Sequence, residues 1–314
     1  MFSIKQPREI VFGKNSAHTY KYPKNLLIIT SPGAEKRNWL EYLQLKNYYI
    51  FDKVEPNPSI DITTDIINEF HSTNFSNIIG IGGGSCLDVA KFVASKLDKK
   101  KILIPTTFGS GSDVTRISVL RVNGKKKSFH DDKLFADVSV IDSNFLPNTP
   151  AQIKKNSAID ACAQCSEAFD SKPGNEYTKF ICKVAFENLE SGIINNNDEQ
   201  LVFGSMLSGL GFGNSSTTLG HALSYVFSNE GIAHGHALAY TTTAAHKFNN
   251  SQFYERFLNI AKKLKFEKIS LKQEIDKASD LILIDRKHLD NNPKSVTKED
   301  IIELLNKINH LNLS

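Results

Sequence analysis

Residues 77–85 read NIIGIGGGS, an apolar run that ends in three consecutive glycines and a serine. The apolar run predicts a buried strand, and residues 86–97 have the apolar spacing of a helix. Glycines allow a backbone to approach a ligand closely, and a helix N-terminus offers free N–H groups to an anion. The pattern is not G-x-G-x-x-G, and a plain tight turn is the alternative. The residues that we expect to bind a pyrophosphate are Gly82, Gly83, Gly84 and Ser85.

The sequence around this stretch alternates short apolar runs with helical patterns. Strands are predicted at residues 26–30, 48–51, 77–81 and 101–105, and helices at residues 61–70 and 86–97. This order predicts a parallel sheet with helices on both faces. Residues 117–122, followed by Asn123-Gly124, predict a hairpin inserted before a last strand at residues 138–142.

A loop rich in hydroxyl groups follows the strand predicted at residues 101–105. Residues 105–115 read PTTFGSGSDVT. Ligands of open α/β sheets bind outside the carboxyl ends of the strands. We therefore predict that Thr106, Thr107 and Ser112 contact phosphate or ribose groups, with a flexible loop of no such function as the alternative.

The strand signals stop after Pro147. Helical patterns then cover residues 157–169, 177–189, 200–211, 218–227, 237–247, 252–265 and 298–311. We therefore expect two domains. The first is an α/β, Rossmann-like nucleotide-binding domain with a parallel sheet, at residues 1–147, and the second is an all-α domain at residues 148–314.

Composition excludes several classes of protein. Apolar residues make up 40% and charged residues 23% of the chain, as in ordinary globular proteins. The net charge is only +4, and the short lysine runs at residues 99–101 and 125–127 are typical of solvated loops, so no nucleic-acid partner is expected. No apolar run is long enough for a bilayer span. Residues 1–8 lack an apolar signal core and the four cysteines are too few for a disulfide framework, which favours a cytoplasmic location.

Three residues of the helical half carry the donor atoms of a catalytic metal site. Asp160 falls in a predicted helix, His221 near the start of another, and His234 in the sequence AHGH. One carboxylate and two imidazoles leave a coordination position open for water or substrate, as in catalytic Zn²⁺ and Fe²⁺ sites. Spacing alone leaves open the alternative that these histidines are ordinary core or surface residues.

Taken together, the ordered motifs resemble those of the iron-containing (group III) alcohol dehydrogenases. They are GGGSCLDVAK (82–91), PTTFGSGSDVT (105–115), Asp160-Ala161, His221-Ala222 and His234-Gly235. The resemblance implies a dehydroquinate synthase-like fold with the active site in the cleft between the two domains. It implies that Asp160, His221 and His234 hold Fe²⁺ or Zn²⁺, and it adds Asp88 to the cofactor-binding residues. NADPH or NADH would exchange hydride with the carbon whose oxygen the metal polarises.

Two positions depart from the family's pattern. The family has a histidine one helical turn after Asp160, where this chain has Gln164, a poorer neutral ligand that we keep as the fourth candidate. Members that prefer NAD often carry an aspartate after the first strand, where this chain has Ser31 followed by Lys36 and Arg37. Without that carboxylate nothing repels a 2′-phosphate, so Ser31 is expected to favour NADPH or the use of both cofactors.

Gln164, the Ser224-Tyr225 pair and His236 resemble the subgroup of phosphonoacetaldehyde reductases, also called hydroxyethylphosphonate dehydrogenases. This resemblance implies a short anionic aldehyde as substrate. It also places Tyr225 and His236, with His221, among the catalytic residues. A lysine that the subgroup implies just before Thr217 is absent.

The leading hypothesis is a metal-dependent NAD(P)H oxidoreductase that interconverts a short anionic aldehyde and its primary alcohol. Its partner would be a small-molecule substrate, and whether the chain forms a homodimer stays open. A lyase like dehydroquinate synthase, which uses NAD transiently, is the first alternative, although the PTT-x-GSGS segment favours the dehydrogenases. Gln164 motivates the second alternative, a metal-less relative without catalytic activity.

Overall fold

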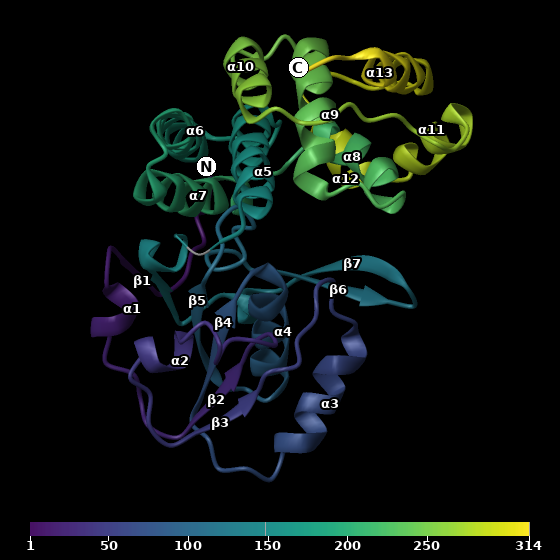
Figure 1. The fold of residues 1–314 in the computed structure, drawn as a ribbon. Helices are drawn as coiled ribbons and strands as arrows, with labels where there is room; N and C mark the ends of the chain where they lie inside the picture. The colour runs from purple at the N-terminus through teal and green to yellow at the C-terminus, as the bar shows by residue number, and fades with distance from the viewer. Residues whose placement is uncertain (148, 314) are drawn as a thin grey trace. The chain divides into compact units, whose positions relative to one another are not determined.

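The computed structural model describes residues 1–147 and 149–313 (Figure 1). Within them the chain forms two compact units. One unit is Ile4–Thr149, and the other joins Met1–Ser3 to the residues from Pro150 onward. Positions 148 and 314, between which the helical domain is predicted, both lie outside the described residues. No helix in the described part of the chain combines the length and the apolar character needed to cross a membrane.

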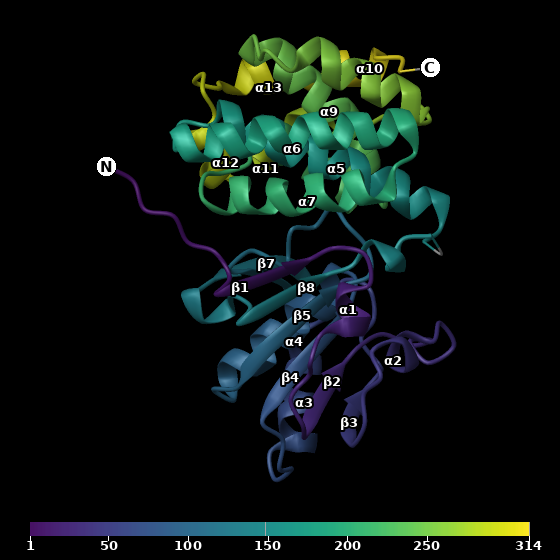
Figure 2. The ribbon, with the colours of Figure 1, turned by 90° about the vertical axis from the view of Figure 1, so that its left-hand side faces the viewer.

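The first unit is built around a six-stranded sheet (Figure 2). Its strands are β1 (Glu9–Phe12), β2 (Leu26–Ile29), β3 (Tyr48–Phe51), β4 (Asn77–Gly82), β5 (Lys100–Pro105) and β8 (Val138–Ile141). They lie in the order β1-β8-β5-β4-β2-β3, and every neighbouring pair is parallel. Gly82 pairs with Pro105 at the carboxyl ends of β4 and β5. The glycine turn and the hydroxyl-rich loop therefore start side by side.

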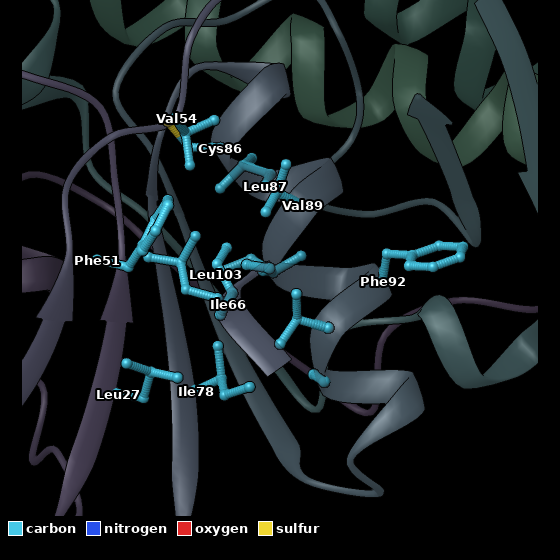
Figure 3. Packing of buried hydrophobic residues seen from close by; sticks show 14 of the residues in the cluster. Leu27, Phe51, Val54, Ile66, Ile78, Cys86, Leu87, Val89, Phe92 and Leu103 are labelled. Carbon is cyan, nitrogen blue, oxygen red and sulfur yellow. The ribbon is translucent and has the colours of Figure 1, made fainter. Parts of the chain in front are cut away.

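Both faces of this sheet are covered, because successive side chains of a strand point to opposite faces. Leu27 and Ile29 of β2 belong to a buried cluster that also takes in α3 (Ile60–Phe70) and α4 (Gly84–Lys96). In Figure 3, Leu27, Ile78 and Leu103 belong to this cluster, together with Ile66 and Leu87 of the two helices.

The opposite face packs against shorter elements. Leu26 and Ile28 of β2 belong to a second buried cluster with residues of α1 (Ser16–Thr19) and α2 (Trp39–Tyr42). The unit is completed by the 3₁₀ turns η1 (Asp132–Leu134) and η2 (Ser143–Phe145) and by an antiparallel hairpin of β6 (Ile117–Val122) and β7 (Lys125–His130). The hairpin turns at Asn123 and Gly124, which have φ values of 49° and 77°, as the Asn-Gly sequence predicts.

The second unit is helical in all its described elements. The helices are α5 (Ala151–Asp170), α6 (Glu176–Asn195), α7 (Asp198–Gly213), α8 (Leu219–Asn229), α9 (His234–Asn249), α10 (Tyr254–Leu264), α11 (Ile275–Leu283), α12 (Arg286–Asn291) and α13 (Lys298–His310). Capping boxes at Asn175 and Thr297 start α6 and α13. Gly204 and Gly211 let α6 and α7 pack closely, since an added Cβ would come within 2.8 Å of Leu189 and 2.3 Å of the Cys182 sulfur.

The predicted fold class, a Rossmann-like α/β part with a parallel sheet followed by a helical part, is confirmed. The predicted strand at residues 138–142 is one residue too long, because the Asp142 side chain instead accepts from Asn144 N–H and caps η2. The sequence also gave no prediction of β1, α1, α2, α11 or α12. Four of these are short, and β1 is held by pairing with β8, more than a hundred residues away in sequence.

Candidate functional site

The glycine turn lies at the start of α4, as predicted. Gly82 has φ of 146°, a conformation that favours glycine, and a Cβ there would come within 2.6 Å of the Cys86 sulfur. Gly83 is the N-cap of α4, and a Cβ on it would lie 3.2 Å from Thr107 Oγ1. Thr106 N–H donates to the Gly82 carbonyl over 2.9 Å. Neighbouring side chains therefore fill the space that a Cβ would need, so the turn requires glycine. It lies at the first N–H groups of a 13-residue helix, a place that suits a pyrophosphate.

Asp88 and Ser112, also predicted to bind the cofactor, are bonded to each other inside the protein. Ser112 Oγ donates to Asp88 Oδ1 over 2.6 Å, and Val119 N–H donates to Oδ2 over 3.0 Å. Lys91, fully buried, lies 3.3 Å from the same carboxylate and donates to the carbonyls of Ser112 and Ile117. Burial raises the pKa of Asp88 and lowers that of Lys91. These contacts fix the loop that carries Thr106 and Thr107, and direct cofactor binding by Asp88 and Ser112 stays a prediction.

Ser31 lies just beyond β2 and next to a cation. Arg37 donates from Nη2 to Ser31 Oγ over 3.2 Å and to the Pro32 carbonyl over 3.0 Å. Its guanidinium also lies over the Trp39 ring, 4.2 Å from the centroid. The position therefore combines a hydroxyl group with a positive charge that can meet a phosphate.

Asp160, His221 and His234 come together from three helices of the helical unit, as predicted. Each offers one donor atom, and these atoms all lie within 4.8 Å of one another. His221 Nε2 is 3.8 Å and His234 Nε2 is 4.0 Å from Asp160 Oδ1. A metal ion with bonds of about 2.0–2.2 Å fits between donors at such spacings, and an Asp-His₂ set suits Zn²⁺ or Fe²⁺.

Glycines beside two of these ligands explain how the helices approach so closely. An added Cβ at Gly220, next to His221, would lie 2.2 Å from Glu167 Oε1 on α5. An added Cβ at Gly235, next to His234, would lie 2.2 Å from the Asn156 carbonyl of the same helix. Any larger residue would push α8 or α9 away from the helix that carries Asp160.

Glu167 is a site residue that the sequence did not reveal. It is almost fully buried, and its Oε2 accepts from His221 Nδ1 over 2.6 Å and from Thr218 N–H over 2.8 Å. The bond to Nδ1 leaves Nε2 of His221 to face Asp160, an arrangement typical of metal-bound histidines. Burial lowers the pKa of His221, but Glu167 and Asp160 outweigh it and raise that pKa to about 9. The signal was the seven-residue spacing from Asp160, two turns along one helix face.

Gln164 lies beside Asp160, one turn along α5, with its amide nitrogen toward the carboxylate. Nε2 donates to Asp160 Oδ1 over 3.0 Å, and Oε1 accepts from Ser208 Oγ over 3.5 Å. In this orientation Gln164 holds Asp160 in place, and ligation by its amide oxygen stays a prediction.

The structure separates the two other predicted catalytic residues. Tyr225 stacks on His234, with ring centroids 6.2 Å apart and planes at 15°. His236 instead bonds through Nε2 to the Glu267 carbonyl over 2.6 Å and contacts the Phe266 ring, and it is not part of the group of metal-ligand atoms found among the described residues. His288, on the unpredicted α12, lies parallel to His221 at 6.2 Å.

A parallel sheet with a glycine turn, followed by helices that carry an Asp-His₂ cluster, defines a class of nucleotide- and metal-binding α/β proteins with a helical domain. Residues 7–143 match the family model described as iron-containing alcohol dehydrogenase, and residues 154–283 match the C-terminal model of the same family. The chain belongs to the iron-containing alcohol dehydrogenase family, and the predicted resemblance is confirmed.

The relatives carry names of several activities. A 4-hydroxybutyrate dehydrogenase of Clostridium kluyveri is 31% identical over 57% of this chain and 56% of its own length. A long-chain-alcohol dehydrogenase of Geobacillus thermodenitrificans is 31% identical over 69% of this chain and 64% of its own. The chain thus spans under two thirds of the length of either relative.

A solved structure supports the fold. The sulfoacetaldehyde reductase of Bifidobacterium kashiwanohense, in complex with NAD⁺, superposes with a TM-score of 0.88 over 99% of this chain and 100% of its own, at 21% identity. At that identity the likeness establishes the fold alone.

Proposed function

We propose that this chain is a metal-dependent NAD(P)H oxidoreductase that interconverts a short anionic aldehyde and its primary alcohol. The observation that carries the proposal is the convergence of Asp160, His221 and His234, with donor atoms within 4.8 Å of one another. Three protein ligands leave a coordination position for the substrate oxygen, which distinguishes a catalytic from a structural metal site.

In this proposal each residue of the cluster has a separate task. Asp160, His221 and His234 hold Fe²⁺ or Zn²⁺, which when bound polarises a carbonyl or stabilises an alkoxide. Glu167 fixes the ring of His221 with a bond of 2.6 Å to Nδ1. Gln164 steadies Asp160 through a bond of 3.0 Å. Tyr225 lines the site through its stack on His234.

The α/β unit would supply the hydride-carrying cofactor. The turn from Gly82 to Ser85 would bind the pyrophosphate at the N-terminus of α4, with Thr106 and Thr107 beside it. Arg37, bonded to Ser31, would meet a 2′-phosphate, which favours NADPH over NADH.

The anionic substrate class is supported by the name of one relative. A 4-hydroxybutyrate dehydrogenase acts, by name, on a short molecule with an acidic group. Phosphonoacetaldehyde belongs to the same chemical class and remains the substrate that the subgroup resemblance proposes.

The test is an assay of the metal-loaded protein with NADPH and with NADH. Phosphonoacetaldehyde, sulfoacetaldehyde, succinic semialdehyde and simple alkanals are compared, with Fe²⁺, Zn²⁺ or Ni²⁺ added. We expect stoichiometric cofactor consumption that is lost in His221→Ala together with bound metal, and is kept in the control His310→Ala at the exposed end of α13. Turnover without net cofactor consumption would identify the lyase instead. Absence of both metal and turnover would favour the relative without catalytic activity.

A further inference from the structure

Four aromatic side chains of the helical unit form a closed cycle, which we call the four-ring cluster: His221, His234, Tyr225 and His288. Going round the cycle, the ring centroids are 5.5, 6.2, 5.8 and 6.2 Å apart. His221 lies parallel to His288 within 13°, and His234 lies parallel to Tyr225 within 15°. Two of the four are candidate metal ligands, so His288 and Tyr225 form the remaining walls of the site.

His288 is held in a fixed orientation by Asp285, the N-cap of α12. Asp285 Oδ2 lies 2.6 Å from His288 Nδ1, and Oδ1 accepts from the His288 backbone N–H over 3.4 Å. A carboxylate accepts hydrogen bonds, so Nδ1 must carry the hydrogen. In the neutral ring Nε2 is then a hydrogen-bond acceptor.

Among the described residues this acceptor has no hydrogen-bond partner. His288 is only 7% exposed, and no other group in residues 1–147 and 149–313 hydrogen-bonds its Nε2. His288 Nε2 is not one of the fully buried unpaired atoms of the described residues, so a small ligand can reach it. An accessible acceptor on a largely buried ring is free to serve that ligand. The residue also lies beyond position 283, where the match to the family model ends.

His288 repeats the arrangement of His221 in a parallel ring whose centroid is 6.2 Å away. Both rings are bonded through Nδ1 to a carboxylate at 2.6 Å. Among the described residues, however, the group of donor atoms within 4.8 Å of one another includes His221 and not His288. His288 thus stacks on a candidate metal ligand without belonging to the donor group itself.

We propose that His288 is a catalytic residue of this chain whose Nε2 accepts a hydrogen bond from the reacting hydroxyl group of the alcohol, and that Asp285 is its positioning residue. The proposal rests on the proposed function and adds to it the group that orients the substrate oxygen. A hydroxyl held between the metal and Nε2 has its hydrogen directed to His288, which fixes the carbon that must face the nicotinamide.

Variants of the metal-loaded, full-length protein test the role of Nε2. His288→Phe keeps a ring in the cluster and removes both nitrogens, and His288→Gln restores an acceptor without a ring. His310→Phe makes the same change on the exposed end of α13. For alcohol oxidation we expect kcat/KM to fall about 100-fold in His288→Phe, to recover in part in His288→Gln, and to fall by a smaller factor in Asp285→Asn. Unchanged kcat/KM in His288→Phe, or a loss that only follows loss of bound metal, would overturn the proposal.

A binding measurement separates this proposal from the proposed function. Co²⁺-loaded protein without nicotinamide cofactor is titrated with 4-hydroxybutyrate and with butyrate, which lacks the hydroxyl, and the Co²⁺ absorption is followed. We expect His288→Phe to lose about tenfold of the wild-type preference for 4-hydroxybutyrate over butyrate, and to keep only the part that the metal itself supplies. That binding result without any turnover would overturn the proposed function and support the role of His288. Turnover, together with the same preference for 4-hydroxybutyrate in the wild type and in His288→Phe, would support the proposed function and overturn the role of His288.

Discussion

Replacing Glu167 with glutamine tests the central electrostatic feature of the metal cluster. Both bonds of this carboxylate, from His221 Nδ1 and from Thr218 N–H, reach Oε2. A glutamine with its oxygen at that place keeps both hydrogen bonds. The substitution removes the charge and puts an amide NH2 where the unpaired Oε1 lies.

The magnitude follows from the pKa of His221. That pKa is raised to about 9 from an ordinary value of 6.5, because the effect of the carboxylates exceeds that of burial. Below about pH 9 a proton competes with the metal for Nε2, so metal affinity should rise tenfold per pH unit and about 100-fold between about pH 7 and 9. The raised pKa of His221 also stabilises the metal-free protein, by about 1.36 kcal/mol per pKa unit, or about 3 kcal/mol in all. This stabilisation is complete below about pH 6.5 and should be lost as the pH rises through about 9.

Glu167→Gln should abolish the pH dependence of metal affinity and the pH dependence of stability over this range. Without the carboxylate charge, burial brings the pKa of His221 back toward its ordinary range. Loss of a partner of this kind lowers metal affinity by about 10–100-fold. The variant should therefore bind metal about as well as the wild type near pH 7 and about 10–100-fold less well near pH 9.

Zn²⁺ competition titrations against a chromophoric chelator across this pH range provide the measurement. Denaturant unfolding of the metal-free proteins at the same pH values gives the stability difference. Glu187→Gln, at an exposed position of α6, is the matched control and should behave as the wild type. A wild-type affinity that does not change with pH, or a Glu167→Gln variant that keeps the wild-type slope, would refute the role given to the carboxylate.

Three further predictions concern the surroundings of the two sites. Gly220→Ala puts a Cβ 2.2 Å from Glu167 Oε1 and should lower both metal affinity and stability, the latter by about 1–3 kcal/mol. The control Gly204→Ala overpacks α6 against α7 and should lower stability alone. Unfolding curves and metal titrations distinguish the two variants. Gln164→His offers an imidazole one turn from Asp160 and should tighten Zn²⁺ binding at least about tenfold, and a result no different from Gln164→Leu would mean that the position does not face the metal. Ser31→Asp places a carboxylate beside Arg37 and should lower the kcat/KM ratio of NADPH to NADH by about tenfold or more, and an unchanged ratio would show that the 2′-phosphate lies elsewhere.

The order of apolar runs was enough to predict most of the fold. The strands at residues 48–51 and 77–81 and the helix at 61–70 were placed within one residue of the observed elements, because they bury a continuous apolar surface with a clear period. β1 was missed, since four residues that are only partly buried carry no such period. Its partner β8 is brought to it by the rest of the sheet.

The site divides in a similar way. Asp160, His221 and His234 were named through motifs that resemble those of the iron-containing alcohol dehydrogenases, since residue type and spacing alone left them open to an ordinary role. The structure brings the three together, and metal binding by them stays a prediction. Glu167 and His288 were not named. The seven-residue spacing of Glu167 from Asp160 is common in helices, and a histidine near a short helix such as α12 is common in any chain. Only their bonds to His221 Nδ1 and to Asp285 reveal what they do.

Local sequence therefore determined most of this protein's strands and helices, its glycine turn and the types of its candidate metal ligands, since these depend on periodicity, on glycine's freedom and on donor chemistry. Tertiary packing alone decided which nitrogen of His221 and of His288 faces a carboxylate, how high the pKa of His221 lies and that His288 stands in the four-ring cluster. Hydrogen bonds, charge interactions and burial act over a few ångströms in space. The residues that exert them here lie 54 positions apart, as Glu167 and His221 do, or 67 apart, as His221 and His288 do.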